Sequence, residues 1–170
     1  MSDKIQKIDF SEIIIASLGE IALKGLNRNK FESRLISNLK RKLKTSGNFE
    51  ITQSQSRICI IPNENNVDMK SVLEKVVKVF GIVSASIAWQ APKSVEMLYN
   101  LSEAYVSDYL SRNNTGTFKI EARRGDKSFP LNSPEICTEL GAYILDKFPS
   151  LKVSVNNPDL TLREGNLSNI

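Results

Sequence analysis

The sequence predicts an α+β protein made of two small domains. Strand-like and helix-like segments alternate through its first half in the order β-α-β-β-α-β, which is typical of a ferredoxin-like sandwich. A short linker, Ala91-Pro92, follows, and a second α/β run begins after it. Hydrophobic residues form 41% of the chain, which is enough to bury two small cores. We therefore expect a ferredoxin-like domain at residues 1–91 and a second domain at residues 92–170.

The first strand and helix follow from simple patterns. A β-branched run from Glu12 to Ala16 predicts a buried strand, and residues 18–26, with two glycines, predict a loop. Asn27 is a good N-cap for the helix that comes next. That helix is expected to run to about Lys44 and to stop before Gly47.

The rest of the first domain contains a hairpin, a helix and a strand. β-Branched residues predict two short strands at 49–52 and 57–61. Helical spacing at Val72, Val76 and Val79/Phe80 predicts a helix over 67–80, and Gly81 is a natural stop. An alternating pattern over 82–89 predicts the last strand.

The second domain begins with a helix capped by Ser94, and a strand is expected at 117–124. Ser133, followed by Pro134, is the expected N-cap of a helix that runs to Phe148. Two further strands are expected at 153–155 and 160–162. The final residues show no strong pattern, so we expect this domain to be cut short.

Composition narrows the possible functions. Lys and Arg number 23 against 19 acidic residues, and the net charge of +4 favours polyanionic partners mildly. Histidine is absent, and the only cysteines are Cys59 and Cys137, which we expect to be core thiols. We therefore expect no catalytic residue, no metal site and no cofactor in this chain. The sequence has no signal peptide and no long apolar run, which predicts a cytoplasmic protein without a membrane segment.

Basic residues dominate the first predicted helix and the loop before it. Between residues 24 and 44 eight side chains are basic and Glu32 is the one acid, so these charges have little to pair with locally. On a helical wheel Lys30, Arg34, Arg41 and Lys44 lie opposite an apolar stripe, where a phosphate backbone could neutralise them. A solvated helix face is the plain alternative. The candidate RNA-binding residues in this region are Lys24, Asn27, Arg28, Lys30, Arg34 and Arg41.

A second basic group surrounds the strand predicted at 117–124. Strand alternation places Lys119 and Arg123 on one face, and the following loop is polar and basic. An aromatic ring beside arginines and the start of a helix could bind a phosphate or stack on a base. Phe129 could equally be a hydrophobic plug that packs the loop onto its own domain. The candidate RNA-binding residues here are Lys119, Arg123, Arg124, Lys127, Phe129 and Ser133.

Four sequence blocks carry a resemblance to a known family. The string from Gly19 to Arg28, GEIALKGLNR, resembles the opening motif of ThiI, the tRNA uridine 4-sulfurtransferase. Val79-Phe80-Gly81-Ile82 is similar to a second motif of that family, and residues 117–130 are similar to its THUMP signature. Asn157-Pro158-Asp159 resembles the motif that precedes the last THUMP strands. Together the blocks cover the chain to about residue 164, in the family's order.

The resemblance implies a ferredoxin-like domain plus a THUMP domain that together hold tRNA by its acceptor arm and 3′ end. It also implies an ATP-using PP-loop domain and a cysteine desulfurase partner, neither of which this chain encodes. A THUMP module of another tRNA-modifying enzyme, such as a methyltransferase, is one alternative. A ferredoxin-like module that senses a ligand or docks an acidic protein is another. A homodimer that spans one tRNA is an arrangement that the sequence leaves open.

Overall fold

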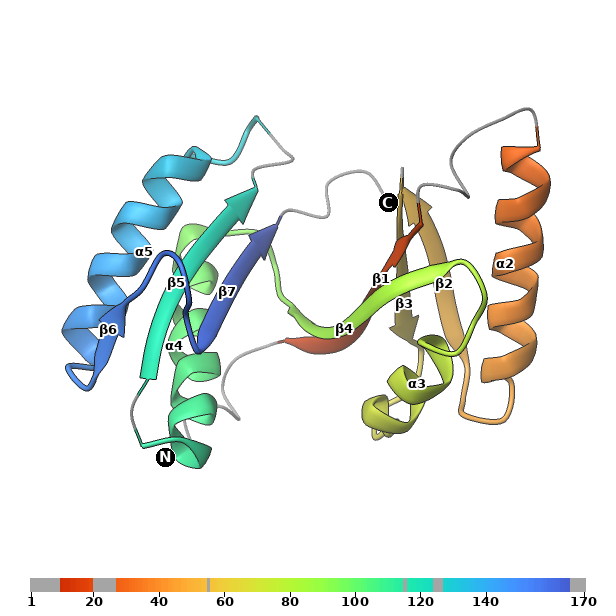
Figure 1. Cartoon of the computed structure of the whole chain (residues 1–170), viewed down its shortest axis with the longest axis horizontal. Helices are drawn as coiled ribbons and strands as arrows, with labels where there is room; N and C mark the ends of the chain where they lie inside the picture. The colour runs from red at the N-terminus through yellow and green to blue at the C-terminus, as the bar shows by residue number, and fades with distance from the viewer. Residues whose placement is uncertain (1–9, 20–26, 55, 115, 124–126, 166–170) are drawn as a thin grey trace. The chain divides into compact units, whose positions relative to one another are not determined.

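The structure, a computed structural model, describes residues 10–19, 27–54, 56–114, 116–123 and 127–165 (Figure 1). Its internal contacts divide the chain into two compact units, one formed by Ser11–Gln90 and the other by the residues from Ala91 onward together with Phe10. Each unit is described by itself. Among the described helices, none combines the length and the apolar character that crossing a membrane requires.

The first unit is an antiparallel sheet covered by two helices. Its sheet has the strand order β2-β3-β1-β4, in which every neighbouring pair is antiparallel. This is the ferredoxin-like arrangement, and the predicted fold class is confirmed. The elements in chain order are β1 (Ser11–Leu18), α2 (Arg28–Leu43), β2 (Phe49–Ser54), β3 (Arg57–Pro62), α3 (Met69–Val76) and β4 (Ile82–Gln90).

Side-chain alternation builds the core of this unit. On β1, Ile14 and Ala16 face the helices and are fully buried. Leu35 and Leu39 on α2 pack against them, since residues four apart lie on one face of a helix. Ile14 is also directly opposite Ile60 on the neighbouring strand. The regular spacing of these apolar residues explains why both elements were predictable.

Helix α3 is shorter than the predicted span of 67–80. The Asp68 side chain caps it by accepting from the Ser71 N–H at 3.2 Å, and the helix ends at Val76. The following residues turn instead, because Val79 N–H bonds to Val76 O at 3.0 Å and Gly81 has a φ of +100°. The apolar spacing therefore continues past the end of the helix.

The second unit packs two helices on a small parallel sheet of order β6-β5-β7. Its elements are α4 (Val95–Arg112), β5 (Gly116–Arg123), α5 (Ser133–Lys147), β6 (Leu151–Val153) and β7 (Leu160–Gly165). The strand predicted at 153–155 lies earlier than expected. Leu151 is buried and pairs with Gly116, whereas Val155 is 71% exposed, so burial selects the earlier residues for pairing.

The N-cap of α5 is Asn132, and the prediction of Ser133 was wrong by one residue. Asn132 Oδ1 accepts from the Glu135 N–H at 2.9 Å, and Glu135 Oε2 accepts from the Asn132 N–H at 2.7 Å. This reciprocal capping box requires a glutamate three residues after the cap, which only Asn132 has. The Asn132 side chain, and not the adjacent Ser133 hydroxyl, therefore caps α5.

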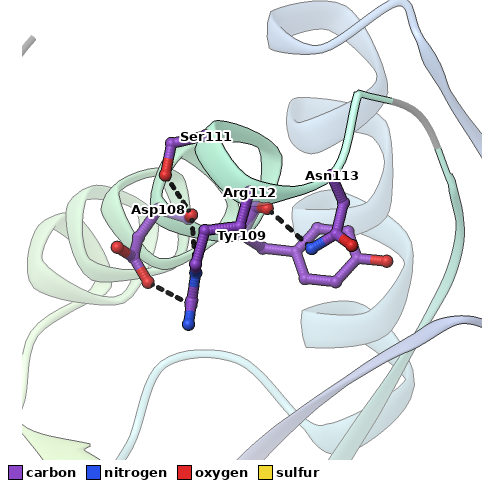
Figure 2. A network of polar contacts seen from close by, with 5 residues as sticks. All are labelled: Asp108, Tyr109, Ser111, Arg112 and Asn113. Atoms are coloured by element: carbon purple, nitrogen blue, oxygen red, sulfur yellow. Dashed lines mark hydrogen bonds and ion pairs between the residues drawn. The ribbon is translucent and has the colours of Figure 1, made fainter.

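The last turn of α4 closes with local polar contacts. Figure 2 shows Arg112 paired with the Asp108 carboxylate at 2.5 Å, while Ser111 Oγ donates to the Asp108 carbonyl at 2.7 Å. Asn113 completes the turn by donating from its side chain to the Tyr109 carbonyl at 3.0 Å. The Arg112 charge is thus neutralised within its own helix.

Asp159 joins the start of β7 to the start of β5. Its Oδ2 atom accepts from the Thr117 N–H and the Thr117 hydroxyl, both at 2.8 Å. The Asp159 N–H in turn donates to Thr117 Oγ1 at 3.1 Å. These bonds lower the pKa of the Asp159 carboxyl below its ordinary value of 3.8, and the bond from the Thr117 backbone N–H has a larger effect than the bond from its hydroxyl.

We expect Asp159→Asn to lower Tm by a few degrees at pH 7, because the charged acceptor is lost. A carboxyl whose folded pKa is lowered contributes stability above its unfolded pKa and loses it as the pH falls through the folded pKa. The Tm difference between parent and variant should therefore shrink as the pH is lowered from about 5 to 2. Thermal melts followed by circular dichroism measure it, and a difference that is constant over this range would contradict the expectation.

Candidate nucleic-acid interface

The exposed face of α2 is a row of cations. The helix directs Leu35, Leu39 and Leu43 into the core, and this leaves the opposite face to solvent. That face is positive because the helix contains many basic side chains and one acid. The exposed cations on it are Lys30, Arg34, Lys40, Arg41 and Lys44.

Most of these charges have no acidic neighbour. Glu32 pairs with Arg28 Nε at 2.8 Å, which uses the single carboxylate of the helix. Among the described residues, no carboxylate forms an ion pair with Lys30, Arg34 or Arg41. Within the described residues, the hydrogen-bond partner of the Arg41 guanidinium is a neutral group, the Asn38 side chain, at 3.2 Å. These groups can therefore accept an external anion without breaking an internal pair.

Two candidate RNA-binding residues, Lys24 and Asn27, precede α2, and the structure describes only Asn27. Asn27 occupies the N-cap position as predicted, but its side chain makes no capping hydrogen bond. It is exposed at the start of the cationic face. Lys24 lies outside the described residues.

Lys119 is less suited to bind RNA than its position suggests. On the face of β5 away from the core, its Nζ atom pairs with Glu121 at 2.6 Å, and Arg163 on β7 pairs with the same carboxylate at 3.0 Å. These two cations, Lys119 first, lower the pKa of the Glu121 carboxyl. Lys119 and Arg163 are thus partly neutralised by Glu121.

Arg123 stands at the end of β5, is exposed and pairs with no described carboxylate. It lines a shallow pocket together with Phe129 and Glu164. Burial raises the pKa of the Glu164 carboxyl, which accepts a hydrogen bond from Ser102 Oγ at 3.2 Å. Lys127 is also exposed, whereas Arg124 lies outside the described residues.

Two expectations about the loop after β5 need correction. Phe129 is only 7% exposed and belongs to the core of the second unit, so it acts as the hydrophobic plug and offers no open face to a base. The start of α5 is also a poor anion site. Its capping box places the Glu135 carboxylate there, the Glu135 N–H is bonded to Asn132, and Pro134 has no N–H. Ser133 is half-buried at this helix end.

One exposed residue beside α2 was not predicted. Phe80 continues the helical spacing of the predicted helix, yet its side chain is 88% exposed. Its ring meets Phe31 of α2 in an edge-to-face contact with centroids 6.4 Å apart. A turn in place of the last helical residues explains the difference, and Gly81 was the sequence signal for that turn.

The described residues offer nothing that would bind a metal. They contain no group of three or more His, Cys, Asp or Glu side chains arranged for an ion. Both cysteines are free thiols, and burial raises the pKa of Cys59. Cys137 is half-buried and donates a weak hydrogen bond to the Ile120 carbonyl at 3.5 Å.

Comparisons with known proteins match both units. A family model described as the ThiI ferredoxin-like domain matches residues 13–86, and a THUMP domain model matches residues 92–163. A probable tRNA sulfurtransferase from Acetivibrio thermocellus is 46% identical over 151 residues, which is 89% of this chain and 38% of that protein. The chain thus spans well under half the length of this relative.

Two solved structures are similar. The crystal structure of a 4-thiouridine synthetase–RNA complex with bound ATP has a TM-score of 0.75 and 32% identity, over 91% of this chain and 38% of that chain. The crystal structure of PH1313 from Pyrococcus horikoshii has a TM-score of 0.80 and 29% identity, over 93% of this chain and 52% of that chain.

Proposed function

We propose that this chain, which belongs to the ThiI ferredoxin-like domain family over residues 13–86 and to the THUMP domain family over residues 92–163, binds tRNA. The observation that carries the proposal is the α2 face, whose cations Lys30, Arg34 and Arg41 have no carboxylate partner among the described residues. A similar protein has been solved in complex with RNA, which supports the same class of ligand. Phosphates are the groups that such a face would neutralise.

The contacts are expected to be mainly with phosphate and ribose. A-form RNA hides its base edges in a deep groove and exposes 2′-hydroxyl groups in a shallow one, so a row of cations recognises shape rather than sequence. We propose that α2 supplies most of the charge and that Arg123 and Lys127 supply a second group. Lys119 contributes less because Glu121 already pairs with it.

For the full-length protein we propose tRNA sulfurtransfer that forms 4-thiouridine, as the names of the similar proteins suggest. The chain spans 38% of the Acetivibrio relative, so ATP use and sulfur delivery from a cysteine desulfurase would depend on parts beyond these two domains. The two domains would dock the acceptor arm and 3′ end of tRNA for that chemistry, in the cytoplasm where tRNA is modified. No catalytic residue is proposed within this chain.

Arg123→Ala combined with Arg124→Ala is expected to weaken tRNA binding by about tenfold or more at 0.1 M salt, because two phosphate contacts are lost. The fold should be unaffected because Arg123 is exposed and outside the core. Filter binding measures the affinity, and circular dichroism confirms the fold. Lys147→Ala with Lys152→Ala, which removes the same charge from exposed positions of the same unit, is the matched control. Equal affinities for the Arg123 and Arg124 variant and the parent would remove those residues from the interface.

A competition between two polyanions tests the proposed class of ligand. A generic basic patch that docks acidic proteins would bind polyglutamate about as well as tRNA of similar charge, since both neutralise cations. A surface suited to RNA is expected to bind tRNA at least tenfold more tightly. Equal displacement of labelled tRNA by the two polymers would favour the protein-docking alternative.

A further inference from the structure

Phe80 is a large apolar side chain that the proposed phosphate contacts leave unexplained. It is 88% exposed, the highest exposure among the large hydrophobic residues that the structure describes. Burying a phenyl side chain stabilises by about 2 kcal/mol. A single exposed ring is common on protein surfaces, so the case for a partner depends on the charges beside it.

The turn that carries Phe80 is closed by backbone hydrogen bonds. Val79 N–H bonds to Val76 O at 3.0 Å, and Ile82 N–H bonds to Val79 O at 3.2 Å, which closes a β-turn with Phe80 at its second position. Gly81 at the third position has the positive φ, +100°, that a type II turn requires. The ring is therefore held in place by backbone hydrogen bonds and by its edge contact with Phe31.

The cationic face of α2 starts next to Phe31, the residue that this ring contacts. On a helical wheel with 100° per residue, three cations of α2 lie within about 100° of Phe31, on the side away from Leu35. These cations are Arg34, Arg41 and Lys30. Phe31 in turn contacts Phe80, so the cationic face begins on the flank of the helix where Phe80 lies.

The segment before Phe80 adds to the positive charge. Lys42 Nζ donates to the Lys78 carbonyl at 3.4 Å, which joins α2 to this segment, and Lys78 itself is exposed. The sequence has no acidic residue between Lys75 and Gln90. The positive charge near the ring therefore suits an anionic polymer. An apolar patch without charged neighbours would not distinguish one class of partner from another.

We propose that Phe80 stacks on an unpaired base of the bound RNA, while Lys30, Arg34 and Arg41 contact the neighbouring phosphates. This inference rests on the proposed function and assigns a single-stranded nucleotide to the edge of the α2 face. Bases within a paired A-form stem are already stacked, so an exposed aromatic ring selects a loop, bulge or end. A flat ring in a cationic groove is the usual stacking platform for single-stranded nucleic acid.

Three substitutions of Phe80 separate stacking from other roles. Phe80→Ala and Phe80→Leu are each expected to weaken tRNA binding by about 5- to 100-fold, since both remove the aromatic face. Phe80→Tyr should bind within about threefold of the parent because it keeps the ring. The slope of log affinity against log salt should be unchanged in all three, because no charge is removed. Val155→Ala, which truncates another exposed apolar residue, should bind like the parent.

A spectroscopic signal provides an independent measurement. Phe80→Trp places an indole at the exposed position, and its fluorescence should be quenched when a single-stranded RNA oligonucleotide is added. The parent, whose only tryptophan is Trp89, should change much less. If Phe80→Ala or Phe80→Leu bound tRNA as tightly as the parent, the stacking inference would be overturned. The parent's own binding to tRNA would still support the proposed function. Failure of the parent itself to bind tRNA would overturn the proposed function.

Discussion

Replacing Lys30, Arg34 and Arg41 together with alanine is expected to weaken tRNA binding by roughly a hundredfold at 0.1 M salt. Each side chain is exposed on α2, and no described carboxylate pairs with any of them, so each is available for one phosphate. Losing three such contacts should also reduce the salt slope by about 2 to 3. Alanine favours helix, so the secondary structure should be retained. Affinity measured at several salt concentrations gives both quantities.

A charge-matched variant distinguishes a local interface from a general field. Arg57→Ala, Lys70→Ala and Lys152→Ala together remove the same three charges from exposed positions on other helices and strands. This control should keep most of the parent's affinity and slope. If the two triple variants lost affinity equally, binding would depend on net charge alone and α2 would have no special part in it.

The largest effect on folding is expected from Gly81→Ala. A Cβ atom at this position would lie 2.6 Å from Phe31 Cζ, and the φ of +100° is one that alanine adopts with strain. Backbone strain and overpacking together should cost roughly 2 to 5 kcal/mol in the free energy of unfolding. Urea unfolding measures this loss.

Gly141→Ala provides the opposite control. Gly141 lies inside α5, where an added Cβ would meet only Ile120 Cδ1 at an ordinary 3.8 Å. Alanine in a helix interior should raise stability by about 0.5 to 1 kcal/mol. Gly81→Ala with parental stability would show that the turn can relax and that its glycine is not structurally required.

The predicted fold depended on local periodicity, and it succeeded where periodicity and burial agree. The apolar stripe of α2 and the alternation of β1 describe both the local structure and the buried face, so both elements were found. The end of α3 was missed because the apolar spacing continues into the turn that carries Phe80. The shift of β6 was missed because Leu151 and Val155 look equally strand-like, and only pairing with Gly116 separates them.

The candidate interface was predictable in charge but not in pairing. The excess of cations on α2 is visible in the sequence, and the single acid already implied that most would be unpaired. The neutralisation of Lys119 was not foreseeable, because Glu121 is also held by Arg163 from another strand. Nor could local patterns place Phe129 in the core and Phe80 in solvent, since both are apolar residues near turns.

The salt dependence of tRNA binding by the parent chain tests the central claim most directly. If about five phosphates are contacted, a slope near 0.7 to 0.9 for each predicts that affinity falls roughly 100- to 500-fold between 50 and 200 mM salt. That steep decline is the predicted result. An affinity that stayed constant over this range, or no measurable binding at 50 mM, would contradict an electrostatic RNA interface on α2.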